Sequence, residues 1–261
     1  MAPTSSRANH PSPTLPLRQE GLPIVVERNQ HRAVTKSANP FDDPAHIDVY
    51  AKRARQMVPT LRDIHRMVGV LIDEHAPQDA KILVLGAGGG LETKAFAETH
   101  PQWTFDAVDP SAAMLDLALK TLGPNASRVR MHHGYIDDAP LGPFSAATSL
   151  LTLHFLAHDE RRRTVAEVRR RLAPGAPFVV VHLSIAQRDD AERKMWIERH
   201  IAYLVASGIK SPDLEKARAA IESEVPVTTP EQDRAILQQA GFTAVTEFFS
   251  AFSFRGWVCY A

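Results

Sequence analysis

The chain has a single cysteine, Cys259, among its 261 residues. One cysteine excludes a disulfide within the chain and is typical of proteins from reducing compartments. No segment approaches the roughly 20 apolar residues of a membrane-spanning helix, and the first ten residues, MAPTSSRANH, lack the apolar core of a secretory signal. These absences predict a cytoplasmic protein without a membrane partner.

An excess of charge of one sign is also missing, because 30 basic residues balance 30 acidic ones. Proteins that bind nucleic acid usually carry a basic excess or a basic stripe, so nucleic acid is not expected as a partner. Arginines do cluster at 161–163 and 169–171, on a helix whose inner face holds Val165 and Val168. We interpret these arginines as a solvated outer face.

The ends of the chain differ in composition from its centre. Residues 1–39 are rich in proline and serine and are predicted to form a flexible tail. Residues 40–261 are predicted to form one domain, with N-terminal helices over 40–78 and a helical substrate cap over 184–231. Within the first part, Thr60-x-x-Asp63 indicates a capping box at the start of a helix.

Strand and helix patterns alternate from Lys81 to Leu183. Alternation of this kind predicts an α/β fold with a parallel, doubly wound sheet. Two further strands, Thr243–Phe249 and Phe252–Tyr260, are expected to close the sheet as an antiparallel hairpin.

A glycine-rich turn follows the first strand of this pattern. The apolar run Lys81–Leu85 leads directly into Gly86-x-Gly88-x-Gly90. Glycines remove the Cβ atoms that would block a ligand, so the turn is expected to present bare main-chain N–H groups. The segment therefore predicts a ligand held close to the backbone.

An acid at the end of the next strand indicates which ligand. Asp109 lies about 23 residues after Gly86, a spacing at which a carboxylate meets the two hydroxyls of a ribose. The dinucleotide fingerprint Gly-x-Gly-x-x-Gly would need glycine at the position of Leu91. A nucleoside with an amino-acid tail is therefore favoured, and a nicotinamide-dependent oxidoreductase is kept as an alternative.

With these features the chain resembles the class I S-adenosylmethionine-dependent methyltransferases over about residues 41–261. The resemblance implies a Rossmann-like, mostly parallel seven-stranded sheet, S-adenosyl-L-methionine as cofactor and S-adenosyl-L-homocysteine as product. The glycine turn would cradle the methionine part, Asp109 the ribose, and Tyr135 and Ile136 the adenine. Tyr50 and Arg55 are expected to close over the cofactor, the alternative being a packed tyrosine and a surface arginine. The implied cofactor-binding residues are Gly86, Ala87, Gly88, Gly90, Asp109, Pro110, Met114, Tyr135, Ile136, Leu151, Tyr50 and Arg55.

One branch of the family, the carboxy-S-adenosylmethionine synthases linked to tRNA wobble-uridine modification, is similar in layout. The shared segments are Phe41–Asp43, Val58-Pro59 and Leu153–Arg161. Arg218 lies near the carboxylate-binding arginine of that branch. Val84 and Ser145, however, stand where the family usually has acids, and His182 where the branch has glutamate. These departures favour an ordinary methyltransferase.

Histidines are the candidates for catalysis. His154 follows the fourth strand and His182 ends the fifth, so either is a candidate general base, with a structural histidine as the alternative. His132 and His133 are adjacent in a strand and point to opposite faces, so no metal site is expected.

Acceptor-binding residues are expected in the cap. Trp196, Tyr203 and Arg218 are predicted to line the acceptor pocket, although the helical spacing of Trp196 and Tyr203 also suits a core. The leading hypothesis is methyl transfer to a small-molecule acceptor, with a homodimer as a candidate assembly. A carboxy-S-adenosylmethionine synthase and a non-catalytic cofactor-binding protein are the other hypotheses.

Overall fold

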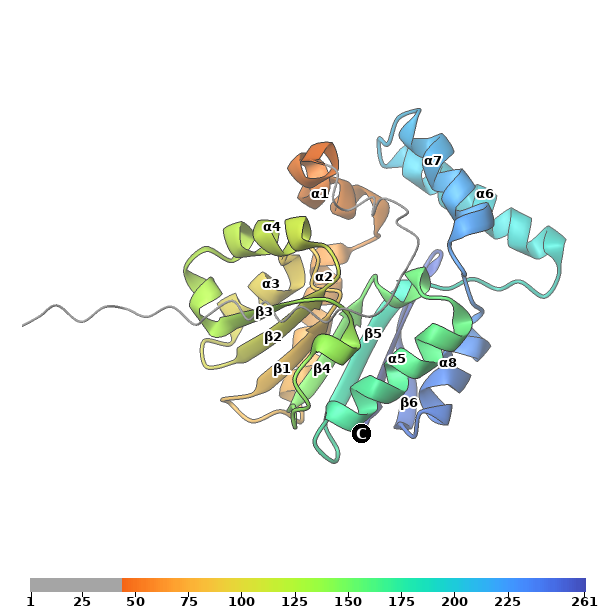
Figure 1. Cartoon of the computed structure of the whole chain (residues 1–261). Helices are drawn as coiled ribbons and strands as arrows, with labels where there is room; N and C mark the ends of the chain where they lie inside the picture. Colours follow the sequence, from red (N-terminus) through yellow and green to blue (C-terminus); the bar gives the residue numbers. More distant parts are fainter. Residues whose placement is uncertain (1–43) are drawn as a thin grey trace, which may run out of the picture.

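One sheet organises the protein, whose computed structural model describes residues 44–261. The predicted tail over 1–39 and the segment Phe41–Asp43 lie outside the described residues. The strand order is β3-β2-β1-β4-β5-β7-β6. The strands are β1 (Lys81–Leu85), β2 (Thr104–Asp109), β3 (Val129–His133), β4 (Ala146–Leu150), β5 (Pro177–Leu183), β6 (Thr243–Ala251) and β7 (Phe254–Tyr260). The first five run parallel, and β7 is antiparallel to β5 and β6, so the predicted fold class is confirmed (Figure 1).

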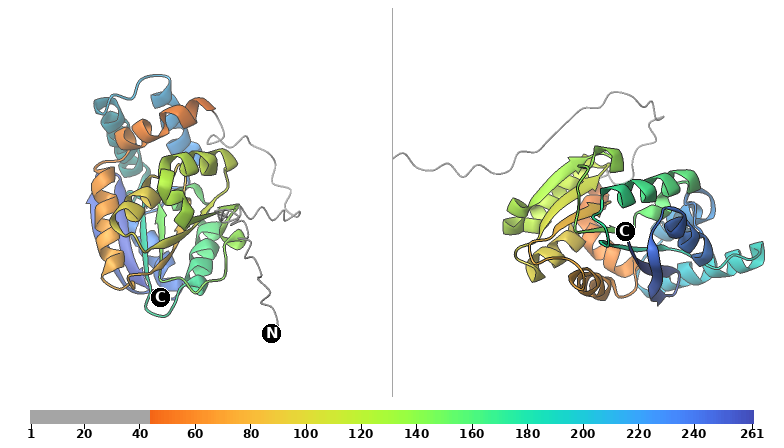
Figure 2. Two further views of the ribbon diagram at one scale, coloured as in Figure 1. Left: turned by 90° about the vertical axis from the view of Figure 1, so that its left-hand side faces the viewer. Right: turned by 90° about the horizontal axis from the view of Figure 1, so that it is seen from below.

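The central strands are buried on both faces, as their continuous apolar sequences predict. Ile82 and Val84 of β1 pack into one core cluster, and Leu83 and Leu85 pack into the other. Helices therefore cover both sides of the sheet (Figure 2). The first side holds α2 (Leu61–Asp73), α3 (Leu91–Thr99) and α4 (Ala112–Leu122); the second holds α5 (His158–Arg171) and α8 (Pro230–Gln239).

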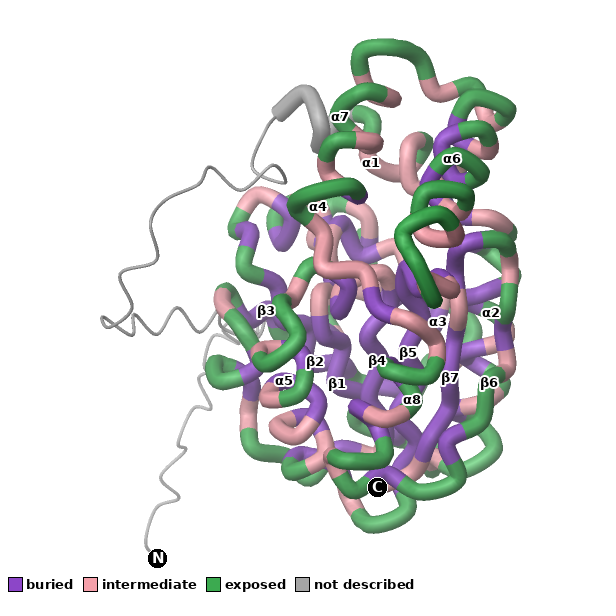
Figure 3. Tube along the Cα trace, turned by 90° about the vertical axis from the view of Figure 1, so that its right-hand side faces the viewer, coloured by how far each residue is buried: buried purple, intermediate pink, exposed green. Residues whose placement is uncertain are grey.

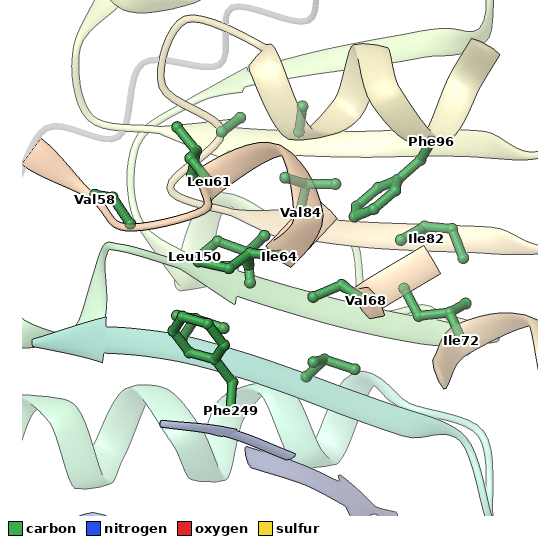
Figure 4. Close-up of a cluster of buried hydrophobic side chains, with 14 of the residues drawn as sticks. Val58, Leu61, Ile64, Val68, Ile72, Ile82, Val84, Phe96, Leu150 and Phe249 are labelled. Carbon is green, nitrogen blue, oxygen red and sulfur yellow. The ribbon is translucent and has the colours of Figure 1, made fainter. Parts of the chain in front are cut away.

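Helix α2 binds the sheet through one apolar stripe (Figure 4). The buried residues of this stripe are Leu61, Ile64, Val68 and Ile72. Burying a side chain of this size stabilises the fold by about 1.5–3 kcal/mol. The predicted capping box is wrong: Thr60 has φ +53° and its side chain makes no capping hydrogen bond. A left-handed residue sets the helix entry instead, directly after Pro59.

The arginine-rich helix α5 is not solvated along its whole outer face. Arg161 and Arg171 are only 1% and 3% exposed, so the interpretation of these two as surface residues was wrong. Arg171 pairs with Glu167 at 2.5 Å, and Arg161 enters a buried network with Asp233 of α8. Each buried guanidinium group thus has a carboxylate beside it, which offsets the cost of burying its charge: the buried Asp233 for Arg161 and the half-buried Glu167 for Arg171.

The C-terminal hairpin turns later than predicted. Strand β6 continues to Ala251, and the turn falls at Phe252 and Ser253, where Phe252 has φ +59°. The chain's cysteine, Cys259, lies in β7 with no exposed surface. Burial raises the pKa of its thiol well above the usual range.

Helices also gather at one end of the sheet, and most of their residues are half-buried or exposed (Figure 3). They are α1 (Pro44–Met57), α6 (Asp190–Ala206), α7 (Asp213–Ala219) and the π-helical turn η5 (Ala220–Glu224); we call the last three the helical cap. Arg53 of α1 pairs with Asp213 at 2.5 Å, and Gln56 donates to Ser207 O at 2.9 Å. None of the described helices has the length and apolar character that crossing a membrane requires.

Candidate functional site

The glycine turn after β1 has a backbone shape that a side chain would prevent. Gly86 and Gly88 have φ +75° and +48°, in the region that favours glycine. A Cβ on Gly86 would lie 2.0 Å from Thr152 Oγ1, and one on Gly88 would lie 2.8 Å from the Tyr50 hydroxyl. The turn therefore sits tightly between the end of β4 and helix α1.

The main-chain N–H groups of this turn are used within the fold. Gly86 and Ala87 donate to Val108 O at 2.8 and 3.0 Å, and Gly88 donates to Asp109 Oδ2 at 2.8 Å. The expectation of bare N–H groups was therefore wrong for these three residues. Gly86 and Gly88 therefore allow a ligand to approach the backbone closely, but they do not supply it with hydrogen-bond donors.

A cavity of about 490 Å³ opens beside the turn, at the carboxyl ends of the parallel strands. A volume of this size suits a small organic ligand, and strand ends at a reversal of strand order are where open α/β sheets bind ligands. The predicted residues that line it are Tyr50, Gly86, Ala87, Gly88, Asp109, Pro110, Met114, Tyr135, Ile136 and Leu151. Two predicted cofactor residues do not: Gly90 packs against Ala118, and Arg55 is exposed.

Asp109 is held in one orientation at this cavity. Its two carboxylate oxygens accept from the main-chain N–H groups of Gly88 at 2.8 Å and Ser111 at 2.9 Å. Gly134 N donates to Asp109 O at 3.0 Å, which fixes the segment after β3 beside the end of β2. Tyr135 and Ile136 follow directly and line the same cavity. A carboxylate fixed in this way is suited to accept hydrogen bonds from a vicinal diol.

Known proteins that are similar to this chain bind or produce a nucleoside, S-adenosyl-L-methionine or its carboxylated form. A model of the methyltransferase domain matches residues 82–175. A carboxy-S-adenosyl-L-methionine synthase from Chromohalobacter salexigens is 27% identical over 224 residues, which are 84% of this chain and 82% of that protein. These matches support a methyltransferase domain of the class I S-adenosylmethionine-dependent kind. Its cofactor is S-adenosyl-L-methionine.

Solved structures share the fold of this methyltransferase. An O-methyltransferase family protein from Burkholderia thailandensis aligns with a TM-score of 0.58 at 17% identity, covering 84% of this chain and 61% of that one. Phosphoethanolamine N-methyltransferase 2 from Haemonchus contortus, solved with S-adenosyl-L-methionine, aligns with a TM-score of 0.58 at 13% identity, covering 83% and 56%. The chain thus spans about 60% of the length of such structures.

The methyltransferase cavity contains a buried acid that the sequence analysis missed. Glu92, in the first turn of α3, lines the cavity and is 6% exposed. The Thr148 hydroxyl donates to Glu92 Oε1 at 2.7 Å. Burial raises the pKa of Glu92 to about 8, although the hydrogen bond from Thr148 opposes that rise.

Two other titratable groups of the cavity have shifted pKa values. Burial lowers the pKa of His65 to about 4, and the charge of Arg55 lowers it further. Burial raises the pKa of Tyr50 to about 12, against a hydrogen bond with the Gly89 main chain that lowers it. At neutral pH the methyltransferase therefore presents a neutral imidazole and a neutral phenol to the cavity. His65 lies on the apolar stripe of α2, four residues after Leu61, which was the signal for its inward position.

The predicted catalytic histidines do not line this cavity. His154 is buried and accepts from Leu183 N at 3.4 Å. His182 is 2% exposed, and its Nε2 atom lies 3.1 Å from Asp233 Oδ1, without the alignment of a hydrogen bond. Burial and then the charge of His182 lower the pKa of His154 well below its usual range. The structure thus places His154 and His182 among buried polar groups. This position agrees with the alternative interpretation, in which both histidines are structural.

The predicted acceptor residues also lie away from the cavity lining. Trp196 and Tyr203 pack against Phe252, with ring centroids 6.2 and 5.6 Å apart. Arg218 pairs with Glu198 at 2.5 Å. Instead, η5 contributes Glu224, and Val225 follows it in the lining. The cap therefore reaches the cavity through its π-helical turn, and π-helical turns occur frequently at functional sites.

The adjacent histidines of β3 have separate partners. His132 Nε2 lies 2.7 Å from Asp106 Oδ1, and His133 Nε2 lies 3.0 Å from Pro110 O. Within residues 44–261 no group of histidine, cysteine and acidic side chains is arranged to hold a metal ion.

Proposed function

We propose that this methyltransferase transfers the methyl group of S-adenosyl-L-methionine to a small-molecule acceptor bound in the 490 Å³ cavity. The observation that carries the proposal is the charge of the lining. Its described residues include three carboxyl groups, those of Glu92, Asp109 and Glu224, and no lysine or arginine. A cationic sulfonium nucleoside suits such a lining, whereas the pyrophosphate of a dinucleotide would find no counter-charge there.

In this proposal, different residues of the cavity lining contact the ribose, the adenine and the methionine part of the cofactor. Asp109 accepts from the ribose hydroxyls, and Tyr135 and Ile136 flank the adenine. The methionine part lies along Gly86 and Gly88, where the missing Cβ atoms allow close approach. These assignments are supported by the lining residues and by the fixed orientation of Asp109.

The acceptor is proposed to occupy the side of the cavity below the cap. When bound, S-adenosyl-L-methionine supplies a methyl group activated by its sulfonium. The apolar side chains of Leu61, Phe155 and Val225 exclude water there and hold the acceptor in line with the methyl carbon. The neutral His65 imidazole and the Glu224 carboxylate are the acceptors available for a proton or hydrogen bond from the nucleophile.

The first experiment is calorimetric titration of the purified protein with S-adenosyl-L-homocysteine. Asp109→Ala removes the proposed ribose acceptor, and Gly88→Val directs a side chain at Tyr50. Asp109→Ala is expected to raise the dissociation constant by about tenfold or more, the loss expected for a hydrogen bond to a charged group. Gly88→Val is expected to weaken binding because the added side chain occupies the space beside the turn. Asp159→Ala changes an exposed acid on α5 and is expected to leave binding unchanged. Unchanged affinity in Asp109→Ala would reject the proposed ribose contact.

A carboxy-S-adenosylmethionine synthase is the second candidate, and the relatives that bear that name favour it. Two of them, from Chromohalobacter salexigens and Pseudomonas fluorescens, are 27% identical to this chain. Against it, the added carboxylate would need a cation, and Arg218 is engaged with Glu198 and Glu222. Mass spectrometry of ligand retained through purification separates the two candidates. A mass higher by one carboxyl group, lost in Arg218→Ala, would favour the synthase.

Three further expectations remain proposals. They are a cytoplasmic location, a single domain over residues 40–261 and a homodimeric assembly. Size-exclusion chromatography with light scattering tests the assembly, and limited proteolysis tests the domain boundary near residue 40.

A further inference from the structure

Glu92 is the least exposed of the three carboxyl groups that line the cavity. It is the second residue of α3, immediately after the glycine turn, and it is 6% exposed while lining the cavity. Its Oε1 atom accepts from Thr148, whose side chain is fully buried on β4. The hydrogen bond fixes the direction of the carboxyl group.

The second oxygen of Glu92 opens on the cavity. No hydrogen bond joins Oε2 to another described residue, and Oε2 is not one of the sealed polar atoms without a partner. It is therefore accessible from the cavity. Buried carboxyl groups are normally paired, so a carboxyl group with one oxygen directed into a ligand cavity indicates a ligand contact.

The other ionisable groups that face this part of the cavity offer no positive charge to Glu92. They are Tyr50 of α1, His65 of α2, Asp109 of β2 and Glu224 of η5. Tyr50 and His65 are neutral at pH 7, and the other two are acids. A positive charge that would hold Glu92 in its ionised form must therefore come from the ligand, as far as the described lining shows.

The position of Glu92 along the sheet identifies the part of the ligand that it meets. Strand ends follow the order β3, β2, β1, β4. Tyr135 follows β3, Asp109 ends β2, and Glu92 is tied to β4 through Thr148. A nucleoside held at its ribose by Asp109, with its base toward Tyr135, directs its 5′ substituent toward Glu92.

We propose that Glu92 pairs with a positive charge on the 5′ substituent of the nucleoside, so that this site selects a cationic amino-acid tail. The inference rests on the proposed function, because it takes the ligand to be S-adenosyl-L-methionine. That ligand carries two cations beyond its ribose, the sulfonium and the α-ammonium group. Glu92 is a specificity-determining contact for one of them.

Calorimetric titration of Glu92→Gln tests the proposal with three ligands. S-adenosyl-L-methionine carries both cations, S-adenosyl-L-homocysteine carries only the ammonium group, and 5′-methylthioadenosine carries neither. Glutamine keeps the shape and the hydrogen bond from Thr148 but loses the charge. Loss of one charge-assisted contact is expected to weaken binding about 10- to 100-fold. Glu98→Gln on the exposed side of α3 is the matched control and should bind all three ligands normally.

The pattern of losses decides the outcome. Equal weakening for the first two ligands, with 5′-methylthioadenosine unchanged, supports pairing with the ammonium group; weakening for S-adenosyl-L-methionine alone supports pairing with the sulfonium. Unchanged binding of the first two ligands overturns the proposal, and so does equal weakening of all three, which would show a role in cavity shape. If the wild-type protein binds none of them, the proposed function fails instead.

Discussion

At the scale of single residues, Glu92 is expected to reduce the stability of the ligand-free protein. Its pKa in the folded state is raised to about 8, so its contribution to stability is complete below about pH 4.5 and is lost as the pH rises toward 8. At pH 7 the carboxyl group must take up a proton on folding, which costs about 3 kcal/mol. Glutamine has no such cost.

Glu92→Gln is therefore predicted to increase the free energy of unfolding by about 2–3 kcal/mol more at pH 7 than at pH 5. Urea denaturation at the two pH values, without ligand, measures the difference. Glu98→Gln should show no pH-dependent gain, because Glu98 is exposed. A destabilised Glu92→Gln at pH 7 would mean that the carboxyl group is needed for folding. Functional groups often reduce stability in this way.

Some site residues were readable from the sequence because their chemistry depends on spacing along the chain. Asp109 followed from the length of one strand–turn–helix–strand unit. Glu92 was missed because an acid in the first turn of a helix is usually explained by the helix dipole and solvent. Only the packing of α3 against β4 directs this acid into the cavity.

At the scale of secondary-structure elements, a buried polar network joins α5 to α8. The Arg161 guanidinium lies 3.0 Å from Asp233 Oδ1 and also contacts the Thr228 hydroxyl. Burial alone would raise the pKa of Asp233, but His182, Thr228 and Arg161 together lower it to about 2. The stability from this carboxylate is therefore present above about pH 4 and is lost only as the pH falls toward 2.

Arg161→Met is predicted to destabilise the protein by about 3–5 kcal/mol, because it leaves the Asp233 carboxylate buried without its arginine. Arg162→Met, which replaces the exposed neighbour, should change stability by less than about 0.5 kcal/mol. Thermal and urea unfolding of both variants measure the contrast. Equal effects of the two substitutions would contradict the structural role given to Arg161.

The boundaries of elements were less predictable than their existence. The C-terminal turn, for example, is displaced to Phe252 and Ser253. Local sequence could not show this displacement, because strand ends depend on pairing with a neighbouring strand. The same holds for His154 and His182, whose positions after strands did not reveal the interior network.

At the scale of the whole molecule, segments far apart in the sequence close the cavity. Tyr50 and Ala54 line it from α1, while Ala220, Glu224 and Val225 line it from the end of the cap. The Arg53–Asp213 pair joins these two segments directly. The fold class was predictable because alternating strands and helices fix the layers, whereas the side of the cap that meets the cavity depends on this long-range contact.

Binding of S-adenosyl-L-homocysteine is predicted to slow amide hydrogen exchange in residues 50–57 and 213–225 by about tenfold or more, because ligand contacts must break before these segments open. Mass spectrometry of peptide fragments measures the change. Peptides from 243–260 lie outside the cavity lining and serve as the internal control. Protection confined to the glycine turn would show that the ligand does not contact α1 or the cap.

Because Cys259 is buried in β7, the rate at which its thiol is alkylated measures how often this part of the sheet opens. A thiol with a raised pKa and no exposed surface reacts with alkylating reagents only after its surroundings separate. Because it is the sole sulfhydryl of the chain, every labelling event reports the detachment of one strand, which lies between β5 and β6. A ligand that stabilises the whole sheet would lengthen the labelling half-life of Cys259. A ligand that stabilises only the helices around the cavity would leave it unchanged.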